Sequence, residues 1–175
     1  MTEQRWPHGI PPDATFKQLL YSHGADMLVV RLIRRSVSSQ EEFYARRSND
    51  STYELLPLPS GYAYRSVCVS SGTPQLFALQ WRQHPEGDDW TGVICLNLLD
   101  MSLSVLQDVD IPSSGQRHWI VSLHGTSSDG HKLFCVVATE RRTGELSSAV
   151  TYELCSFDIP SRSLVVISHL QAGFM

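Results

Sequence analysis

A segment that joins a turn to a strand occurs three times in this chain. In each copy a serine precedes a turn that contains glycine, and a leucine six residues after that serine opens an apolar run. These leucines are Leu28, Leu76 and Leu133, so the copies recur roughly every 50 residues. Recurrence at this period predicts a repeat architecture in which each copy contributes one small unit to a shared core.

Short runs rich in Val, Ile, Leu, Phe, Tyr and Cys alternate with clusters of Ser, Gly, Pro and Asp along the whole chain. This alternation is typical of short β-strands separated by turns. The helical period fits poorly, because only Phe16, Leu19 and Leu20 are spaced to form a helical turn. We predict strands at 26–34, 41–47, 51–56, 64–70, 75–82, 91–99, 102–107, 118–124, 132–139, 149–158 and 163–169.

The expected unit is an antiparallel meander of about four strands. A single sheet of this size cannot bury its apolar faces alone, whereas sheets stacked face to face around an axis bury them, as the blades of a β-propeller do. The prediction is therefore an all-β fold of antiparallel four-stranded blade-like repeats, a partial or small β-propeller. We expect a single domain over 1–175, with an extended arm at 1–14 and repeats at 15–60, 61–112 and 113–175.

The number of repeats leaves alternatives open. Propellers typically close with four to eight blades, and three repeats are counted here. Either a fourth blade forms from residues 1–20 and the C-terminus, or the chain is a partial array. A partial array needs a second copy or another subunit to cover its exposed sheet edges and faces. The competing fold is an open, twisted antiparallel sheet or a β-sandwich.

The third repeat resembles one blade of the TolB-type, WD40-like propellers. The residues concerned are Thr126–Val137, which read TSSDGHKLFCVV, followed by Thr151–Asp158 and Ser163–Ile167. Blades of this type carry Ser-Pro-Asp-Gly, a basic residue, an apolar strand, a hairpin and a strand that ends in Asp. Here Ser128 stands in the position of the proline. The resemblance implies a fold and no particular activity, since propellers include enzymes, scaffolds and receptors.

Arginine dominates the basic residues, with twelve arginines against two lysines. Five arginines lie where the leucine-containing strand of a repeat ends. They are Arg34, Arg35, Arg82, Arg141 and Arg142. Equivalent positions in stacked blades share a rim, so we predict a row of guanidinium groups suited to carboxylate or phosphate partners. The alternative is that charge at hairpin tips and sheet edges prevents aggregation.

Three histidines flank one predicted strand and its turn: His118, His124 and His131. With Asp129 they could surround a metal ion, but their spacings of six and seven residues match no established metal motif. We predict no metal site, with His124 and His131 as the candidate ligands if one exists. Ser127, His124 and Asp129 are chemically able to form a catalytic triad. Phosphate-loop, dinucleotide and HExxH signatures are absent, and no cofactor is predicted.

The cysteines and the net charge limit the cellular compartment and the classes of partner that we expect. The four cysteines, at 68, 95, 135 and 155, lie in apolar runs without any CxxC pair, which predicts buried, reduced thiols. The first residues lack the basic start and apolar stretch of a secretory signal, so we expect a cytoplasmic protein. A net charge of −4 disfavours nucleic acids and anionic membranes as partners, and no apolar run is long enough to cross a bilayer.

The leading functional prediction is a non-catalytic protein-interaction or scaffold module of β-propeller type. Its expected partner is another protein or a second copy of the chain, which makes a homo-oligomer. The second hypothesis is a propeller-type lyase or hydrolase with a site at a rim or on the axis. TolB-like repeats occur in oligogalacturonate lyases and beside peptidase domains, so the resemblance allows this. A third hypothesis is a partial propeller without independent activity.

Overall fold

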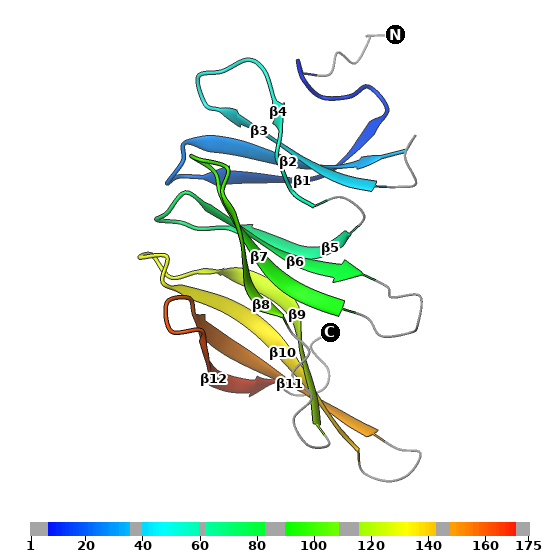
Figure 1. The fold of residues 1–175 in the computed structure, drawn as a ribbon, viewed down its shortest axis with the longest axis vertical. Helices are drawn as coiled ribbons and strands as arrows, with labels where there is room; N and C mark the ends of the chain where they lie inside the picture. The colour runs from blue at the N-terminus through cyan, green and yellow to red at the C-terminus, as the bar shows by residue number, and fades with distance from the viewer. Residues whose placement is uncertain are drawn as a thin grey trace.

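The computed structural model describes residues 7–35, 40–59, 62–82, 90–108, 116–142 and 148–170. These residues form three separate four-stranded sheets and no helix (Figure 1). The strands of sheet 1 are β1 (Ala14–Ser22), β2 (Met27–Arg34), β3 (Gln40–Arg47) and β4 (Glu54–Leu55). Those of sheet 2 are β5 (Ala63–Val69), β6 (Gln75–Arg82), β7 (Trp90–Asn97) and β8 (Leu103–Asp108). Those of sheet 3 are β9 (Gln116–Thr126), β10 (Lys132–Arg142), β11 (Ser148–Asp158) and β12 (Ser163–Leu170).

In every sheet the strands lie side by side in chain order, and each neighbouring pair is antiparallel. Each sheet is therefore a meander whose strands are joined by local connections. The sheets stack one after another, with sheets 1 and 3 at the two ends of the stack (Figure 1). This arrangement confirms the all-β, blade-like fold predicted from the repeats.

Strand β1 was not predicted, and it contains Phe16, Leu19 and Leu20, the residues with the spacing of a helical turn. The register of β1 against β2 shifts between Phe16 and Gln18, so Lys17 is an extra residue. Such a β-bulge interrupts the two-residue alternation of a strand. Phe16 and Leu19 therefore share a face although they are three residues apart, and their spacing imitates that of a helix.

The inner strands of sheet 2 are buried on both faces because the sheet lies between the other two. Leu76 and Ala78 of β6 pack against sheet 1, whereas Phe77 and Leu79 pack against sheet 3, and all four side chains are fully buried. Successive side chains of a strand point to opposite faces, so one apolar run can supply two cores. Burial of a large apolar side chain contributes about 1.5–3 kcal/mol, so these two contacts are the main source of cohesion between the sheets.

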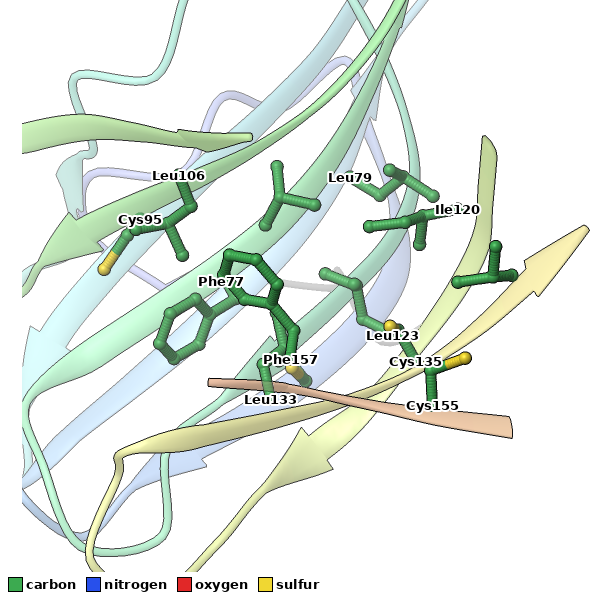
Figure 2. Close-up of a cluster of buried hydrophobic side chains, with 13 residues drawn as sticks. Phe77, Leu79, Cys95, Leu106, Ile120, Leu123, Leu133, Cys135, Cys155 and Phe157 are labelled. Atoms are coloured by element: carbon green, nitrogen blue, oxygen red, sulfur yellow. The ribbon is translucent and has the colours of Figure 1, made fainter. Parts of the chain in front are cut away.

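We call the contact between sheets 1 and 2 the first seam and the contact between sheets 2 and 3 the second seam. The first seam contains Ala25, Met27, Val29, Phe43, Ala45, Leu56, Tyr64, Val67, Leu76, Ala78, Ile94, Leu96 and Leu98. The second seam contains Cys68, Phe77, Leu79, Val93, Cys95, Leu106, Ile120, Leu123, Leu133, Cys135, Val137, Cys155 and Phe157 (Figure 2). All four cysteines are free and buried, as predicted.

The repeated leucines occupy equivalent places in the three sheets. Leu28, Leu76 and Leu133 are each the second residue of the second strand, in β2, β6 and β10. A backbone hydrogen bond near the same turn also recurs in each sheet. Its three forms are Ser48 N to Asp26 O at 3.1 Å, Leu98 N to Pro74 O at 2.7 Å and Ile159 N to His131 O at 2.9 Å. The repeat seen in the sequence is thus a repeat of backbone geometry.

The described residues do not form a fourth sheet, since residues 14–22 supply β1 of sheet 1. The segment before β1 lies at the sheet 1 end of the stack (Figure 1). There Ile10 packs against Val30, Leu32 and Tyr44 on the face of sheet 1 that is opposite the first seam. Among the described residues, nothing forms a helix with the length and apolar character needed to span a membrane.

Candidate functional site

The five predicted arginines lie at the ends of equivalent strands. Arg34, Arg82 and Arg142 are the last residues of β2, β6 and β10, Arg141 precedes Arg142, and Arg35 follows Arg34. The C-terminal ends of these three strands lie along one edge of the stack, which we call the arginine rim (Figure 1). The side chains of Arg82 and Arg142 lie outside the part of the chain that the structure describes.

Arg34 is held by two carboxylates. Its Nε donates to Asp13 at 3.0 Å and its Nη1 donates to Glu42 at 3.4 Å. The hydrogen bond to Asp13 raises the pKa of the guanidinium above its ordinary value. Glu42 also accepts a hydrogen bond from the Tyr44 hydroxyl at 2.7 Å, and burial raises the pKa of Tyr44 to about 12. The charge of Arg34 is therefore matched within sheet 1 and the segment before it.

Arg35 and Arg141 are the exposed members of the arginine rim whose side chains are described. Arg35 borders an open hollow of about 360 Å³, which is also lined by Asp13 and Phe16. This hollow lies at the sheet 1 end of the stack, whereas Arg141 lies on sheet 3. The two exposed guanidinium groups of the rim that the structure describes thus lie on different sheets, at the two ends of the stack.

The opposite edge of the stack, the turn rim, carries the turns that join the first and second strands of each sheet. These turns touch through glycines. A Cβ atom on Gly24 would lie 2.4 Å from the carbonyl carbon of Thr73, and one on Gly130 would lie 2.4 Å from Thr73 Cγ2. A Cβ atom on Gly72 would lie 1.9 Å from Ser128 O. The glycine of each repeat is needed because the neighbouring turn occupies the space of a side chain.

The repeated serines stabilise the same turns. Each hydroxyl accepts a hydrogen bond from a backbone N–H of its own turn, as is usual for serine at such positions. The bonds are Ala25 N to Ser22 Oγ at 3.3 Å, Thr73 N to Ser70 Oγ at 3.2 Å and Lys132 N to Ser127 Oγ at 3.0 Å. The serine in the sequence repeat therefore has a structural role.

The histidines do not converge on one point. His118 Nδ1 lies 2.9 Å from Thr139 Oγ1, and His124 Nε2 lies 2.9 Å from Ser122 Oγ. Across the described ranges, no three His, Cys, Asp or Glu side chains are grouped so that they could hold a metal ion. His124 and His131, the candidate ligands, are thus not part of such a group.

The structure does not assemble the candidate triad of Ser127, His124 and Asp129. The Ser127 hydroxyl donates to the Asp129 carboxylate, and Asp129 also accepts the backbone N–H of His131 at 3.0 Å. The imidazole of His124 is hydrogen-bonded to Ser122 instead. A triad requires the base to contact the nucleophile, so the Ser127–Asp129 pair is part of a turn and not a catalytic unit.

The first seam contains an ion pair that was not predicted from the sequence. Arg31 is 5% exposed, and its guanidinium donates to Glu41 through Nη2 at 2.7 Å and Nε at 3.2 Å. Arg31 also donates to the carbonyl oxygen of Tyr64 in β5, and Tyr64 N donates to Glu41 at 3.1 Å. The pair therefore ties sheet 1 to the first strand of sheet 2. An arginine in the apolar run Val29–Ile33 was the available signal, because an isolated charge there needs a partner.

The face of sheet 3 opposite the second seam carries exposed apolar side chains; we call it the C flank. The register pairs Val136 with Leu154 and Ser156 with Val165, which places these side chains on that face. Val165 is 59% exposed, and Val150 on β11 is also exposed. Seven of the eight residues of β12 are exposed, including all four of its run Leu164–Ile167. The signal in the sequence was this run itself, in a strand that alternates apolar faces.

A small hollow lies where β3 and β4 meet the turn after β7. It has a volume of about 130 Å³, and its lining includes Arg46, Asp50, Glu54 and Met101. Arg46 donates to the carbonyl oxygen of Asp50 at 2.7 Å, so its guanidinium stabilises the turn after β3. Pockets for small-molecule ligands usually measure about 300–1,000 Å³. This hollow is below that range and has no further role here.

Comparison with known proteins bears on the fold. The chain matches no protein-family model. No curated protein matches it significantly. Among solved structures it is similar to the acylaminoacyl peptidase of Pyrococcus horikoshii, with a TM-score of 0.61 and 10% identity over 92% of this chain and 26% of that chain. It is also similar to the β-propeller domain of the Trilobed protease from Pyrococcus furiosus, described as having an open velcro topology. That match has a TM-score of 0.55 and 13% identity, over 92% of this chain and 44% of that chain.

The fold is propeller-like. The sheets of the stack correspond to blades, each formed by a four-stranded meander. The chain spans 26% of the length of the peptidase chain and 44% of the length of the β-propeller domain. The described stack is therefore a propeller arc with two end faces, and those end faces are the surfaces that distinguish it from a closed ring.

Proposed function

We propose that this propeller arc is a non-catalytic protein-interaction module that binds its partner through the C flank. The observation that carries the proposal is the exposure of Val165 and Val150 on this face, with the partly buried Phe134 on the same face. Contiguous exposed apolar surface on a folded protein is typical of a binding site for another protein. The faces of sheets 1 and 2 that correspond to the C flank pack against the next sheet in the two seams. The C flank is therefore suited to packing against another sheet.

The arginine rim is proposed as a second contact surface, suited to acidic groups on the partner. The exposure of Arg35 and Arg141 supports this assignment, whereas the ion pairs of Arg34 argue against a direct role for that residue. Changing Arg141 and Arg142 together to serine is expected to leave the fold intact and to weaken binding of an acidic partner. Unchanged binding would contradict the assignment.

The TolB-type character of the blades also belongs to the proposal. The turn in residues 127–131 supports it, because Ser127, Asp129 and Gly130 each have a geometric role there. Ser127 and Asp129 are hydrogen-bonded to each other, and Gly130 has a φ of +73°, a conformation that favours glycine. Ser128, in the place of the family's proline, offers its carbonyl oxygen to the close contact with Gly72.

The lyase or hydrolase hypothesis takes second place. One structural neighbour is a peptidase, but its identity of 10% carries the fold alone. The described residues leave Ser127 and His124 in separate hydrogen bonds, so the arrangement supplies no activated nucleophile there.

The experiment is site-specific photo-cross-linking from the C flank. A photoreactive amino acid replaces Val165 in one variant and Val166 in a control variant. Val166 is register-paired with Cys155 and so lies on the other face of β12, with similar exposure. The proposal expects saturable adducts with a defined protein, another molecule or a second copy, from position 165 and far fewer from position 166. Equal labelling at both positions, or hydrolytic activity that a Ser127→Ala change abolishes, would contradict it.

A further inference from the structure

The two ends of the stack carry opposite halves of the same kind of contact. In the first seam, sheet 1 offers Met27 and Val29, whereas sheet 2 offers Leu76 and Ala78. In the second seam, sheet 2 offers Phe77 and Leu79, whereas sheet 3 offers Leu133 and Cys135. We call the face of a sheet that packs against the next sheet in the chain its following face, and the face that packs against the previous sheet its preceding face. Each seam thus joins the following face of one sheet to the preceding face of the next. The preceding face of sheet 1, which we call the N flank, and the following face of sheet 3, the C flank, have no sheet against them among the described residues.

The N flank retains the apolar pair that sheets 2 and 3 bury in their seams. In each first strand, one apolar residue pairs with the position two residues after the repeated leucine, and another pairs with the position four residues after it. These pairs are Leu19 and Phe16 in sheet 1, Val67 and Tyr64 in sheet 2, and Leu123 and Ile120 in sheet 3. In all three strands a β-bulge lies between the two members of the pair, so the three pairs are equivalent in backbone geometry, although the first strand of sheet 3 has a second bulge after its pair.

The exposure of these equivalent residues differs sharply. Tyr64 and Ile120 are each 2% exposed because a preceding sheet covers them, whereas Phe16 is 55% exposed. Leu19 is 54% exposed, in contrast to the buried Val67. The segment before β1 covers Val30 and Leu32 through Ile10, but this cover does not bury the two exposed residues of β1. The N flank is therefore a seam surface without its other half along β1.

The C flank is the matching half. Phe134 follows Leu133 as Phe77 follows Leu76, and Val136 corresponds to Leu79 in the same way. Phe77 is fully buried by sheet 3, whereas Phe134 is only partly buried; Val136, like Leu79, is buried. On the same face, Val165 is the most exposed apolar side chain of β12. Sheet 3 thus offers a following face of the kind that the N flank would accept.

We propose that a second copy of the chain closes the arc, with the N flank of each copy seated on the C flank of the other. The inference rests on the proposed function and specifies its partner. Two identical contacts related by a twofold axis would join two stacks of three sheets into a ring of six, within the usual four to eight blades. One chain carries both halves of the contact, so a second copy satisfies both ends at once. No other exposed apolar surface is required.

The test measures the molar mass of the purified chain by light scattering across a dilution series. Leu19→Asp places a charge on the N flank, and Val165→Asp places one on the C flank. Both positions are more than half exposed in the single chain, so neither change disturbs a seam within it. Val166→Asp is the matched control, on the opposite face of β12. Circular dichroism verifies that every variant retains its strands.

The expected result is twice the mass of one chain for the wild type and for Val166→Asp, and the mass of one chain for Leu19→Asp and for Val165→Asp. An equimolar mixture of the two flank variants is expected to form a heterodimer, because one N flank and one C flank remain intact between them. A wild-type chain that stays monomeric would overturn the proposal. So would a Leu19→Asp variant that still dimerises, which would indicate a contact of two C flanks, or an open-ended series of larger species. If the wild-type chain is monomeric but still forms adducts with another protein from position 165, the proposal of a second copy as the partner is overturned. The proposal of an interaction module is then retained.

Discussion

Gly72 in the turn of sheet 2 lies directly against Ser128 in the turn of sheet 3. A Cβ atom built on Gly72 would be 1.9 Å from the Ser128 carbonyl oxygen, well inside any permitted contact. The contact joins two copies of the same turn, so the spacing of the sheets at the turn rim depends on the absence of a side chain. The second seam is thus defined at one edge by backbone contact and in its interior by apolar packing.

Gly72→Ala is expected to destabilise the fold, because the backbone of Ser128 must move to admit the methyl group. Overpacking of this kind typically costs about 1–3 kcal/mol. The measurement is the free energy of unfolding in urea. Ser71→Ala, at the neighbouring residue, is the matched control. The side chain of Ser71 is exposed, and it is the backbone N–H of Ser71 that is hydrogen-bonded to sheet 3. Equal stabilities for the two variants would contradict the close contact.

The Arg31–Glu41 pair is expected to be essential to the first seam. Glu41→Ala would leave the Arg31 guanidinium buried without its carboxylate, and loss of one partner of a buried pair costs about 3–5 kcal/mol. Chemical denaturation gives this value. Lys17→Met removes the other cation bound to Glu41, but Lys17 is 39% exposed on its side chain, so the change should cost about 1 kcal/mol or less. If both variants lose equally little, the pair does not hold the sheets together.

The sequence was informative about the repeats because turn chemistry is local. The serine, the glycine and the leucine of each repeat lie within seven residues of chain, and each has one geometric requirement that the structure retains. The fold class followed from these repeats and from the alternation of apolar runs. Buried thiols followed from the position of each cysteine inside such a run.

Relationships between distant residues could not be predicted in the same way. The bulge at Lys17 is visible only in the pairing with β2, and it hid β1 behind a helical spacing. Asp13 neutralises Arg34 from 21 residues away, so the predicted arginine rim has a member whose charge is already used. The hydrogen bond between His124 and Ser122 is local, but it depends on side-chain rotamers that the spacing of the two residues does not specify.

The turn aspartates are expected to make stability sensitive to acid. Asp158 accepts hydrogen bonds from Ser161 Oγ at 2.6 Å and Ser161 N at 2.9 Å, and these bonds lower its pKa below the ordinary 3.8. A lowered pKa in the folded state means that stability is fully present above about pH 5 and falls as pH drops through 3.8 toward the folded value. Asp158→Asn should reduce the fall in stability at acid pH. The measurement is the urea midpoint of unfolding from neutral to acid pH. A profile with an unchanged slope would contradict the role of this turn.

The buried thiols are expected to be inert in the folded protein. Burial raises the pKa of Cys68 and of Cys135 to about 12, and that of Cys95 to about 11. The thiolate is the reactive form, so an aromatic disulfide reagent at pH 8 should label the cysteines only after unfolding. Because the folded pKa values exceed the unfolded value of 9.0, stability should be constant below pH 9 and decline above it. Rapid labelling under native conditions would contradict the burial of the second seam.

The most direct test of the stacked sheets is a double-mutant cycle across the second seam. Phe77 of β6 and Phe157 of β11 lie in the same buried cluster, with both rings in its interior (Figure 2). Phe77→Leu, Phe157→Leu and the double variant are compared by free energy of unfolding, with Phe43 of the first seam and Phe157 as the control pair. If sheets 2 and 3 pack face to face, the interaction energy between Phe77 and Phe157 should be roughly 0.5–3 kcal/mol, and the effects of the control pair should be additive. Additivity within about 0.3 kcal/mol for Phe77 with Phe157 would contradict it.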